Sequence, residues 1–299
     1  AMSSQAALAS QVKDGDSLNS FKLGLIGSTD NHKARAGAGY KEFARKSMGD
    51  SWGAKDHLTW ILPPERGASF YSTGGLVAVH SNRLDRNDIY NSLYDREVYA
   101  TSGERILLWF NLLKDGKEIP MGSELTLSNV PNFEVRAVGA YKQLPGCPDY
   151  VNEAMSKEEI SRLCLNECYN PSNERHLIDR IEVVKIQPTQ NLNSIDQAIH
   201  DPWLIHECDD QGQGCSFTFE DESYKNDQID SVYYVRAIQH KTDAVGGDPL
   251  RCDYNEQGEC IKINPCYASG PDFEPSDDCL APIGERAWSS PIFLNYLNQ

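Results

Sequence analysis

The 299-residue chain has no long apolar run and no excess of positive charge. None of its apolar runs approaches the roughly 20 residues that a membrane-spanning helix needs, so we expect no membrane span. Lys and Arg number 28 and Asp and Glu number 44, which gives a formal net charge of −16. A chain this acidic is poorly suited to binding nucleic acid or an anionic membrane surface.

Several familiar catalytic and metal-binding motifs are also missing. The chain contains no G-x-S-x-G, P-loop or H-E-x-x-H motif and no tight Cys-x-x-Cys pair. No signal peptide is visible. Ala1 ahead of Met2 is typical of a cleavage scar, so we expect Met2 to begin an expressed fragment or a shortened reading frame.

Cysteine is absent before Cys147, and all nine cysteines lie between Cys147 and Cys279. Their spacing indicates four local pairs and leaves Cys147 over: Cys164/Cys168, Cys208/Cys215, Cys252/Cys260 and Cys266/Cys279. This pattern favours disulfides formed in an oxidising compartment over a zinc site, with free buried thiols as the alternative. Connectivity cannot be read from sequence. We expect mostly local disulfides, with Cys252–Cys260 and Cys266–Cys279 first among them.

The stretch from Phe21 to His32 is the most informative part of the chain. An apolar run ends at Gly27 and is followed by Asp30 and His32. Such a run is typical of a buried strand in a parallel sheet, whose carboxyl end carries catalytic groups. Asp30 and His32 would point to the same side of an extended chain and offer oxygen and nitrogen ligands for Zn, Mn or Fe. The alternative is an ordinary turn or helix cap.

Further helices and strands are expected on either side of a long irregular segment. Residues 3–12 are Ala-rich and predict a helix, and Leu76–Val79 predicts a second short buried strand. Residues 33–73 are rich in glycine and aromatics, which favours either a functional lid or a packed loop without a role. Asp85 can cap a helix, and we expect its inward face to carry Ile89, Leu93 and Tyr90.

After Gly103 the pattern changes to β-structure. We expect strands at 106–113, 133–138, 178–186, 232–238 and 292–294, a hairpin turn at 114–117 and one helix at 152–165. Separated short strands with turn-rich connections predict an antiparallel β-sandwich from about Glu104 to Tyr296. Its expected inner faces include Ile106, Leu108, Phe110, Val135, Ile181, Val183, Tyr233, Val235 and Phe293.

Three segments resemble a known superfamily of enzymes. Gly27-Ser28-Thr29-Asp30-Asn31-His32 is similar to the last metal motif, Asp-x-His after a barrel strand, of the polymerase-and-histidinol-phosphatase (PHP) superfamily of metal-dependent hydrolases. GGLVAVHSNRLDRNDIYNSLYDREVYATSGERI at 74–106 and NPCYASGPDFEPSDDCLAPIGERAWSSPIFL at 264–294 resemble the C-terminal part of a PHP-related family of exported bacterial proteins, labelled a domain of unknown function. The resemblance runs over nearly the whole chain from about Ala6.

The resemblance implies a fold and a site. Residues 1–103 would be an incomplete remnant of a PHP-like α/β barrel, and 104–299 a disulfide-braced antiparallel β-sandwich, which makes the fold class mixed α+β. Asp30 and His32 would bind a divalent metal, Zn or Mn, in the intact parent. Ser102 and Arg105 would lie near that site, or have ordinary surface roles.

The family's upstream ligands have no counterpart here. Its first strand carries a His-x-His, whereas no two of the remaining histidines of this chain make that motif: His57, His80, His176, His200, His206 and His240. We therefore expect this chain to be the C-terminal fragment of a metal-dependent hydrolase of small-molecule esters or phosphoesters. By itself the fragment would be inactive, and it need not bind a cofactor. The alternative is a non-catalytic exported β-sandwich module for binding or interaction.

Three further expectations follow from composition and from the incomplete barrel. The acidic pairs Asp209-Asp210 and Asp277-Asp278 lack EF-hand spacing, so solvated turns are favoured over Ca²⁺ sites. The disulfides place the protein in the periplasm or outside the cell. An incomplete barrel exposes strand edges, which predicts self-association unless residues 33–73 cover them.

Overall fold

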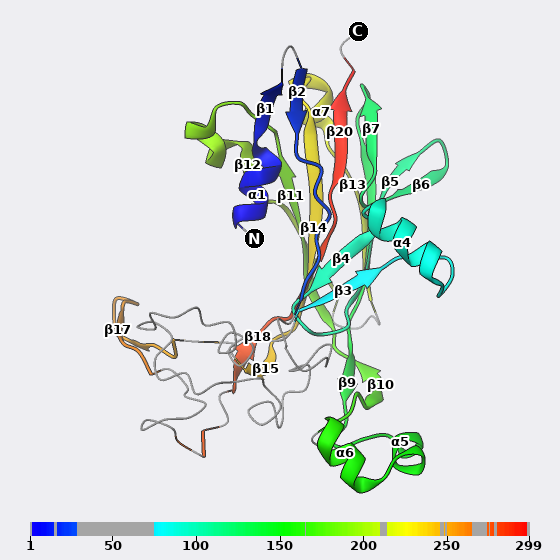
Figure 1. The fold of residues 1–299 in the computed structure, drawn as a ribbon. Helices are drawn as coiled ribbons and strands as arrows, with labels where there is room; N and C mark the ends of the chain where they lie inside the picture. The colour runs from blue at the N-terminus through cyan, green and yellow to red at the C-terminus, as the bar shows by residue number, and fades with distance from the viewer. Residues whose placement is uncertain are drawn as a thin grey trace.

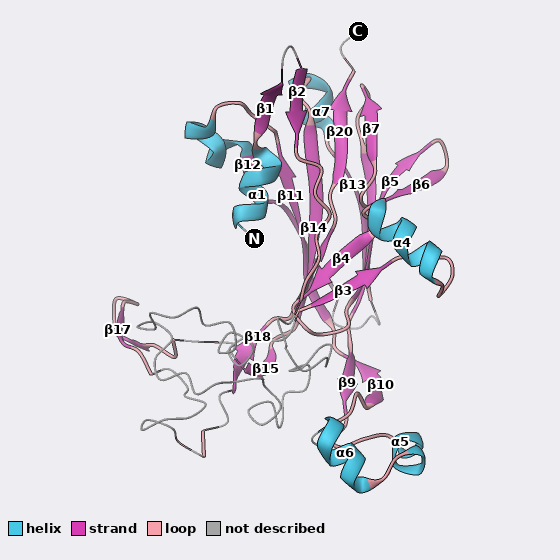
Figure 2. Cartoon of the chain, viewed as in Figure 1, coloured by secondary structure: helices cyan, strands magenta, loops and turns pink. Residues whose placement is uncertain are grey.

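The computed structural model describes residues 2–14, 17–28, 75–164, 166–209, 214–245, 248, 250–264, 274, 276–277 and 280–297. These parts of the chain are mixed and strand-rich, with several sheets (Figures 1 and 2). The helices are α1 (Met2–Ala9), α4 (Arg86–Tyr94), α5 (Asp149–Ala154), α6 (Lys157–Cys164) and α7 (Glu222–Asp227), with a 3-10 helix η1 (Leu192–Ala198). None of the helices in these ranges is both long and apolar enough to cross a membrane.

Two large sheets dominate the structure. The eight-stranded sheet runs in the order β12 (Ile199–Glu207), β11 (Ile178–Ile186), β14 (Ser231–Gln239), β19 (Arg286–Ser289), β4 (Val98–Thr101) and β3 (Leu76–Val79); β20 (Ile292–Tyr296) pairs with β14, and β7 (Glu124–Leu127) pairs with β20. The four-stranded sheet runs β13 (Cys215–Glu220), β8 (Asn132–Val138), β5 (Leu107–Lys114) and β6 (Lys117–Pro120).

Four two-stranded antiparallel sheets complete the described strands. They are β1 (Gln11–Asp14) with β2 (Ser17–Ser20), β9 (Tyr141–Gln143) with β10 (Pro171–Arg175), β15 (Thr242–Val245) with β18 (Leu280–Ile283), and β16 (Asp253–Tyr254) with β17 (Cys260–Lys262). The β9–β10 pair and helices α5 and α6 project together from one end of the large sheets (Figure 2).

The two large sheets share one hydrophobic core. Alternation along β8 buries Phe133, Val135 and Ala137, as a strand with one covered face requires. The ring of Phe133 lies 5.5 Å from that of Phe110 in β5 and 4.8 Å from that of Tyr233 in β14, centroid to centroid. The contact between Phe133 and Tyr233 therefore joins side chains of both sheets in a single cluster.

Most of the core residues expected from the sequence belong to this cluster. The members are Ile106, Leu108, Phe110, Val135, Ile181, Val183, Tyr233 and Val235. Phe293 is the exception, because it lies in a second cluster with Leu8 and Ala9 of α1 and Tyr234. The expected inward position of Phe293 is therefore wrong, and α1 gives the eight-stranded sheet a second covered face.

Several expected elements differ in the structure. Residues 21–28 form no strand, and the described residues show no barrel; β3 pairs antiparallel with β4. The N-terminal helix ends at Ala9, and residues 11–14 form β1. The helix expected at 152–165 is divided into α5 and α6. The sheet that contains β3 and β4 continues through β19 into β14, so it draws strands from both sides of residue 103.

Helix α4 begins as expected, but its inward face is different. The Asp85 carboxylate accepts hydrogen bonds from the backbone N–H groups of Asn87 and Asp88, which makes it the N-cap. Tyr90 and Leu93, expected to face inward, are 64% and 44% exposed. The buried residue of this helix is Ser92.

Two of the expected local disulfides are present, Cys208–Cys215 and Cys252–Cys260. Cys168, however, is bonded to Cys147 and not to Cys164. The backbone explains the choice, because the strand-like pairing of β9 with β10 continues to a hydrogen bond from Cys168 N–H to the Gly146 carbonyl. The remaining expected pair, Cys266 and Cys279, lies outside the described residues.

Candidate functional site

The segment at 21–28 lies across the outer face of the eight-stranded sheet (Figure 1). Lys22 Nζ lies 3.1 Å from a carboxylate oxygen of Glu124, and the backbone N–H of Leu25 donates to Ser290 Oγ at 3.0 Å. These contacts direct the chain toward the ends of β3 and β4. Asp30 and His32, the residues expected to bind metal, lie outside the described residues.

Gly27 makes the closest approach of this segment to the sheet. A Cβ atom there would come within 2.8 Å of the Leu76 carbonyl oxygen and 3.0 Å of the Thr101 carbonyl oxygen. Backbone therefore packs on backbone, which only glycine permits at this spacing. As a result, the chain three residues before Asp30 lies against the start of β3 and the end of β4.

Ser102 follows β4 and forms a joint with β19. Its hydroxyl hydrogen-bonds to the carboxylate of Glu285 and accepts the backbone N–H of Arg286 at 2.8 Å. Glu285 is only 1% exposed. Ser102 therefore tethers a buried carboxylate at the sheet end that Gly27 reaches.

Arg105 contacts the aromatic ring of Tyr169. Its guanidinium lies 3.6 Å from the ring centroid of Tyr169, next to the Cys147–Cys168 disulfide. This cation–π contact attaches the projecting β9–β10 region to the end of the sheets. Ser102 and Arg105 were expected from the sequence to lie near one site. In the structure they contact different residues.

Two buried acidic residues at this end were not expected from the sequence. Glu104 and Glu285 are 3% and 1% exposed. Each is the centre of a Gly-Glu-Arg triplet, at 103–105 and 284–286. The triplets lie beside each other because β4 pairs with β19 and Ser102 N–H donates to the Arg286 carbonyl. The repeated triplet is the signal by which the pair could have been found.

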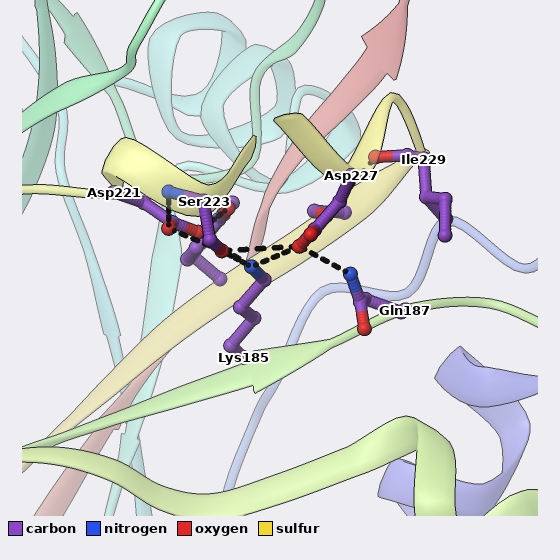
Figure 3. Close-up of polar contacts among 8 residues, drawn as sticks. Lys185, Gln187, Asp221, Ser223, Asp227 and Ile229 are labelled. Carbon is purple, nitrogen blue, oxygen red and sulfur yellow. Dashed lines mark hydrogen bonds and ion pairs between the residues drawn. The ribbon is translucent and has the colours of Figure 1, made fainter. Parts of the chain in front are cut away.

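A second polar cluster surrounds Lys185, where α7 packs on the core (Figure 3). Lys185 Nζ lies 2.7 Å from Asp221 Oδ2 and donates to Ser223 Oγ at 2.8 Å. A second carboxylate, that of Asp227, lies 3.5 Å from the same nitrogen. Lys185 and Asp221 are buried, with 3% and 1% of their side chains exposed. The sequence offered little signal for this cluster, because its members come from separate elements.

Asp221 is the centre of the hydrogen bonding in this cluster. Its Oδ1 accepts the Ser223 backbone N–H at 3.0 Å, which caps α7, and its Oδ2 accepts the Tyr233 hydroxyl at 2.6 Å. Burial acts to raise the pKa of Asp221, but the hydrogen bonds from Lys185, Tyr233 and Ser223 outweigh it and lower the pKa below its ordinary value. Burial and the Asp221 charge raise the pKa of Tyr233.

The contact between Ser223 and Lys185 resembles a catalytic serine–lysine pair in composition only. A general base must accept the serine proton. Lys185 Nζ instead donates to Ser223 and pairs with two carboxylates, and the Ser223 hydroxyl donates to Asp221 Oδ1 at 2.8 Å, so the serine proton is directed to a carboxylate and not to Lys185. We conclude that this cluster fixes α7 to the sheets and does not activate a nucleophile.

Over the ranges that the structure describes, no group of three or more His, Cys, Asp and Glu side chains could hold a metal ion. The sheet end next to Gly27 nevertheless supplies buried carboxylate oxygens, which are donors that divalent metals accept. The described residues therefore fit a metal centre only if further ligands join them.

Comparison with known proteins finds partial similarities. Residues 6–112 match the model of the family described as "Protein of unknown function (DUF3604)". An uncharacterized protein of Chlamydia muridarum is 37% identical over 68 residues, 22% of this chain and 10% of the relative. One from Chlamydia pneumoniae is 39% identical over 61 residues, 20% of this chain and 9% of the relative. The matched part of this chain spans about a tenth of each relative, and no solved structure matches.

Proposed function

We propose that this chain is the C-terminal part of a PHP-like, metal-dependent hydrolase of small-molecule esters or phosphoesters. Asp30 and His32 would be metal ligands, and the metal would be Zn²⁺ or Mn²⁺. Both residues fall within the part of the chain, 6–112, that matches the DUF3604 model. The observation that carries the proposal is the close packing of Gly27, three residues before Asp30, on the Leu76 and Thr101 carbonyl groups, at the sheet end where Glu104 and Glu285 are buried.

The proposal gives Asp30, His32 and Ser102 separate roles. A carboxylate at position 30 and an imidazole at position 32 would offer one oxygen and one nitrogen ligand. Ser102 would hold the Glu285 carboxylate in a fixed orientation through the hydrogen bond that joins them. When bound, a divalent metal supplies a nucleophilic water and stabilises charge on ester oxygens. With too few ligands of its own for a tight site, this chain by itself would have no turnover.

The remaining architecture is part of the same proposal. Residues 1–103 would complete a barrel in a longer, untruncated protein. The strands of the two large sheets that lie within 104–299, which share the core around Phe133, would be the layers of an antiparallel β-sandwich. The three disulfides support an exported protein, periplasmic or secreted.

Metal content and turnover test this function. The chain would be dialysed against ZnCl₂ or MnCl₂, analysed for bound metal, and assayed with p-nitrophenyl phosphate, bis(p-nitrophenyl) phosphate and p-nitrophenyl acetate. We expect weak metal binding that is lost in Asp30→Asn/His32→Gln, and no turnover by this chain alone. Metal binding that survives the double substitution would contradict the proposal.

A second function, a non-catalytic binding module, is favoured by the projecting region made of β9, β10, α5 and α6 (Figure 1). The Cys147–Cys168 disulfide closes it, and it exposes Leu144, Tyr150 and Leu163. A braced extension with apolar side chains is a suitable contact surface. A deletion of 144–170 that abolishes binding to a partner, with hydrolysis absent from the longer protein, would favour this function over the first.

Self-association is the partner interaction that the N-terminal region supports. Leu84 is 97% exposed and Tyr94 is 74% exposed, and Val77 of the neighbouring strand β3 is 44% exposed. A second copy would cover these side chains. Light scattering tests this: a dimer that Leu84→Glu/Tyr94→Glu converts to a monomer is expected, and a wild-type monomer at high concentration would exclude it.

A further inference from the structure

A cavity of about 230 Å³ lies between α1 and residues 25–27, on the outer face of the eight-stranded sheet. Leu8 and Gln5 of α1 line one wall, and Ala100, Tyr234 and Trp288 of the sheet line the opposite one. Leu8 and Tyr234 are 0% and 2% exposed, so the inner end is shielded from water. Ile26 also lines the cavity and is 64% exposed, which places the mouth at residues 25–27.

The size of the cavity fits a small molecule. An apolar cavity of about 150 Å³ in another protein stays dry and binds benzene. The present cavity is larger, so it can hold an aromatic ring with a short substituent. The Leu8 side chain and the Trp288 indole offer apolar surface for the ring.

Tyr234 is a buried donor in the wall of this cavity, which Ser4, Thr101 and Trp288 also line with polar hydrogens. Gln5 Nε2 donates to Tyr234 Oη at 2.7 Å and also hydrogen-bonds to Asp201, so both of its amide hydrogens are used. Tyr234 accepts the first of these bonds, and no acceptor for its own hydroxyl hydrogen is found among the described residues. Burial raises the pKa of Tyr234 to about 12, which keeps that hydrogen in place at neutral pH.

The charges beyond Gln5 select the kind of acceptor. Asp201 is paired with Arg236, which in turn lies 2.7 Å from Glu182. Arg180 pairs with the same Glu182 and with Asp179, so three carboxylates and two guanidinium groups leave a local negative balance behind Tyr234. A neutral oxygen acceptor is therefore favoured over a carboxylate.

We propose that this cavity is a binding site for a small aromatic molecule that carries one neutral oxygen acceptor, such as a ketone, which Tyr234 hydrogen-bonds. The site is distinct in its chemistry from the proposed metal centre, because its lining is mostly apolar and includes no carboxylate. Its ligand is of about ten non-hydrogen atoms, set by the volume. The proposal does not depend on hydrolase activity.

Titration of the whole chain with acetophenone tests the proposal. Saturation-transfer NMR and calorimetry measure the binding. We expect a dissociation constant of roughly 1 mM, as befits so few atoms. Ethylbenzene, which has the ring but no oxygen, should bind about three- to tenfold more weakly, and Tyr234→Phe should weaken acetophenone binding by the same factor. Tyr94→Phe, on an exposed tyrosine of α4, is the matched control and should change nothing.

Filling the cavity separates this site from nonspecific binding. Ala100→Leu extends a side chain into the cavity from β4, and Ser4→Leu does so from α1, a second variant if the first fails to fold by circular dichroism. Each should abolish acetophenone binding. The proposal is overturned if acetophenone does not bind the wild-type chain, if a folded cavity-filling variant binds it equally well, or if ethylbenzene and acetophenone bind alike.

Discussion

Lys185 Nζ lies 2.7 Å from Asp221 Oδ2, and both side chains are almost completely buried. The pair connects β11 of the eight-stranded sheet to the N-terminus of α7. Breaking a buried pair leaves an uncompensated charge, which costs more than the pair itself contributes. This joint should therefore be the most sensitive polar contact of the described structure.

We expect Lys185→Met to lower the free energy of unfolding by ~3–5 kcal/mol, because the Asp221 charge stays buried without its partner. Urea denaturation at neutral pH measures the change. Lys142→Met is the matched control: the Lys142–Glu174 pair is exposed, so its loss should cost at most ~0.5 kcal/mol. Equal losses in the two variants would show that burial gives the Lys185 pair no special weight.

The same carboxylate predicts a pH dependence. Hydrogen bonds lower the pKa of Asp221 from its ordinary value of 3.8. Its contribution is therefore complete above that value and is lost as the pH falls through the lowered folded pKa. The difference in unfolding free energy between wild type and Asp221→Asn should be constant from about pH 8 to pH 5 and should shrink below about pH 4. If this difference in unfolding free energy grew as the pH fell, the pKa of Asp221 would be raised in the folded state and not lowered.

Gly27→Ala should destabilise the chain by roughly 1–3 kcal/mol, because the new Cβ would approach two rigid backbone carbonyl oxygens. Gly24→Ala is the matched control. A Cβ at Gly24 meets side-chain atoms of Arg96 at 3.1 and 3.2 Å, which need to shift by only a few tenths of an ångström, whereas the contacts at Gly27 are with backbone. Thermal unfolding of the two variants compares the effects. If Gly24→Ala were the more damaging of the two, the close packing of Gly27 on β3 and β4 would be refuted.

Peptide mapping of the unreduced protein should recover three cross-linked pairs, Cys147–Cys168, Cys208–Cys215 and Cys252–Cys260. Cys208→Ser/Cys215→Ser should lower the unfolding free energy by ~2 kcal/mol, the loop-closure contribution of so short a loop. A Cys164–Cys168 peptide in place of the first pair would contradict the backbone pairing of β9 with β10.

Local patterns predicted the sheets well. Alternation placed the inward residues of β5, β8, β11 and β14, and Asp115-Gly116 marked the hairpin between β5 and β6, where both residues have positive φ. The apolar pattern at 21–27 wrongly predicted a strand, because an apolar segment that packs on the face of a sheet is as hydrophobic as a strand within the sheet. The alternation pattern failed at Phe293 for a related reason: α1 covers the outer face, so both faces of β20 are apolar.

The candidate site was less predictable, because its contacts join distant parts of the chain. Ser102 meets Glu285 across 183 positions, and no local pattern encodes such a pairing. The Lys185 cluster depends likewise on the way that β11 packs against α7. Spacing alone left Cys147 without a partner, because the partner is determined by the pairing of β9 with β10 and not by the nearest cysteine.

Calorimetric titration with Zn²⁺ tests the central claim, metal ligation by Asp30 and His32, most directly. Two ligands from this chain predict weak but saturable binding of about one equivalent, which Asp30→Asn/His32→Gln removes. Asp196→Asn/His200→Gln replaces the same residue types at exposed positions and should leave binding unchanged. Equal Zn²⁺ binding by the wild type and the Asp30/His32 variant would contradict the account.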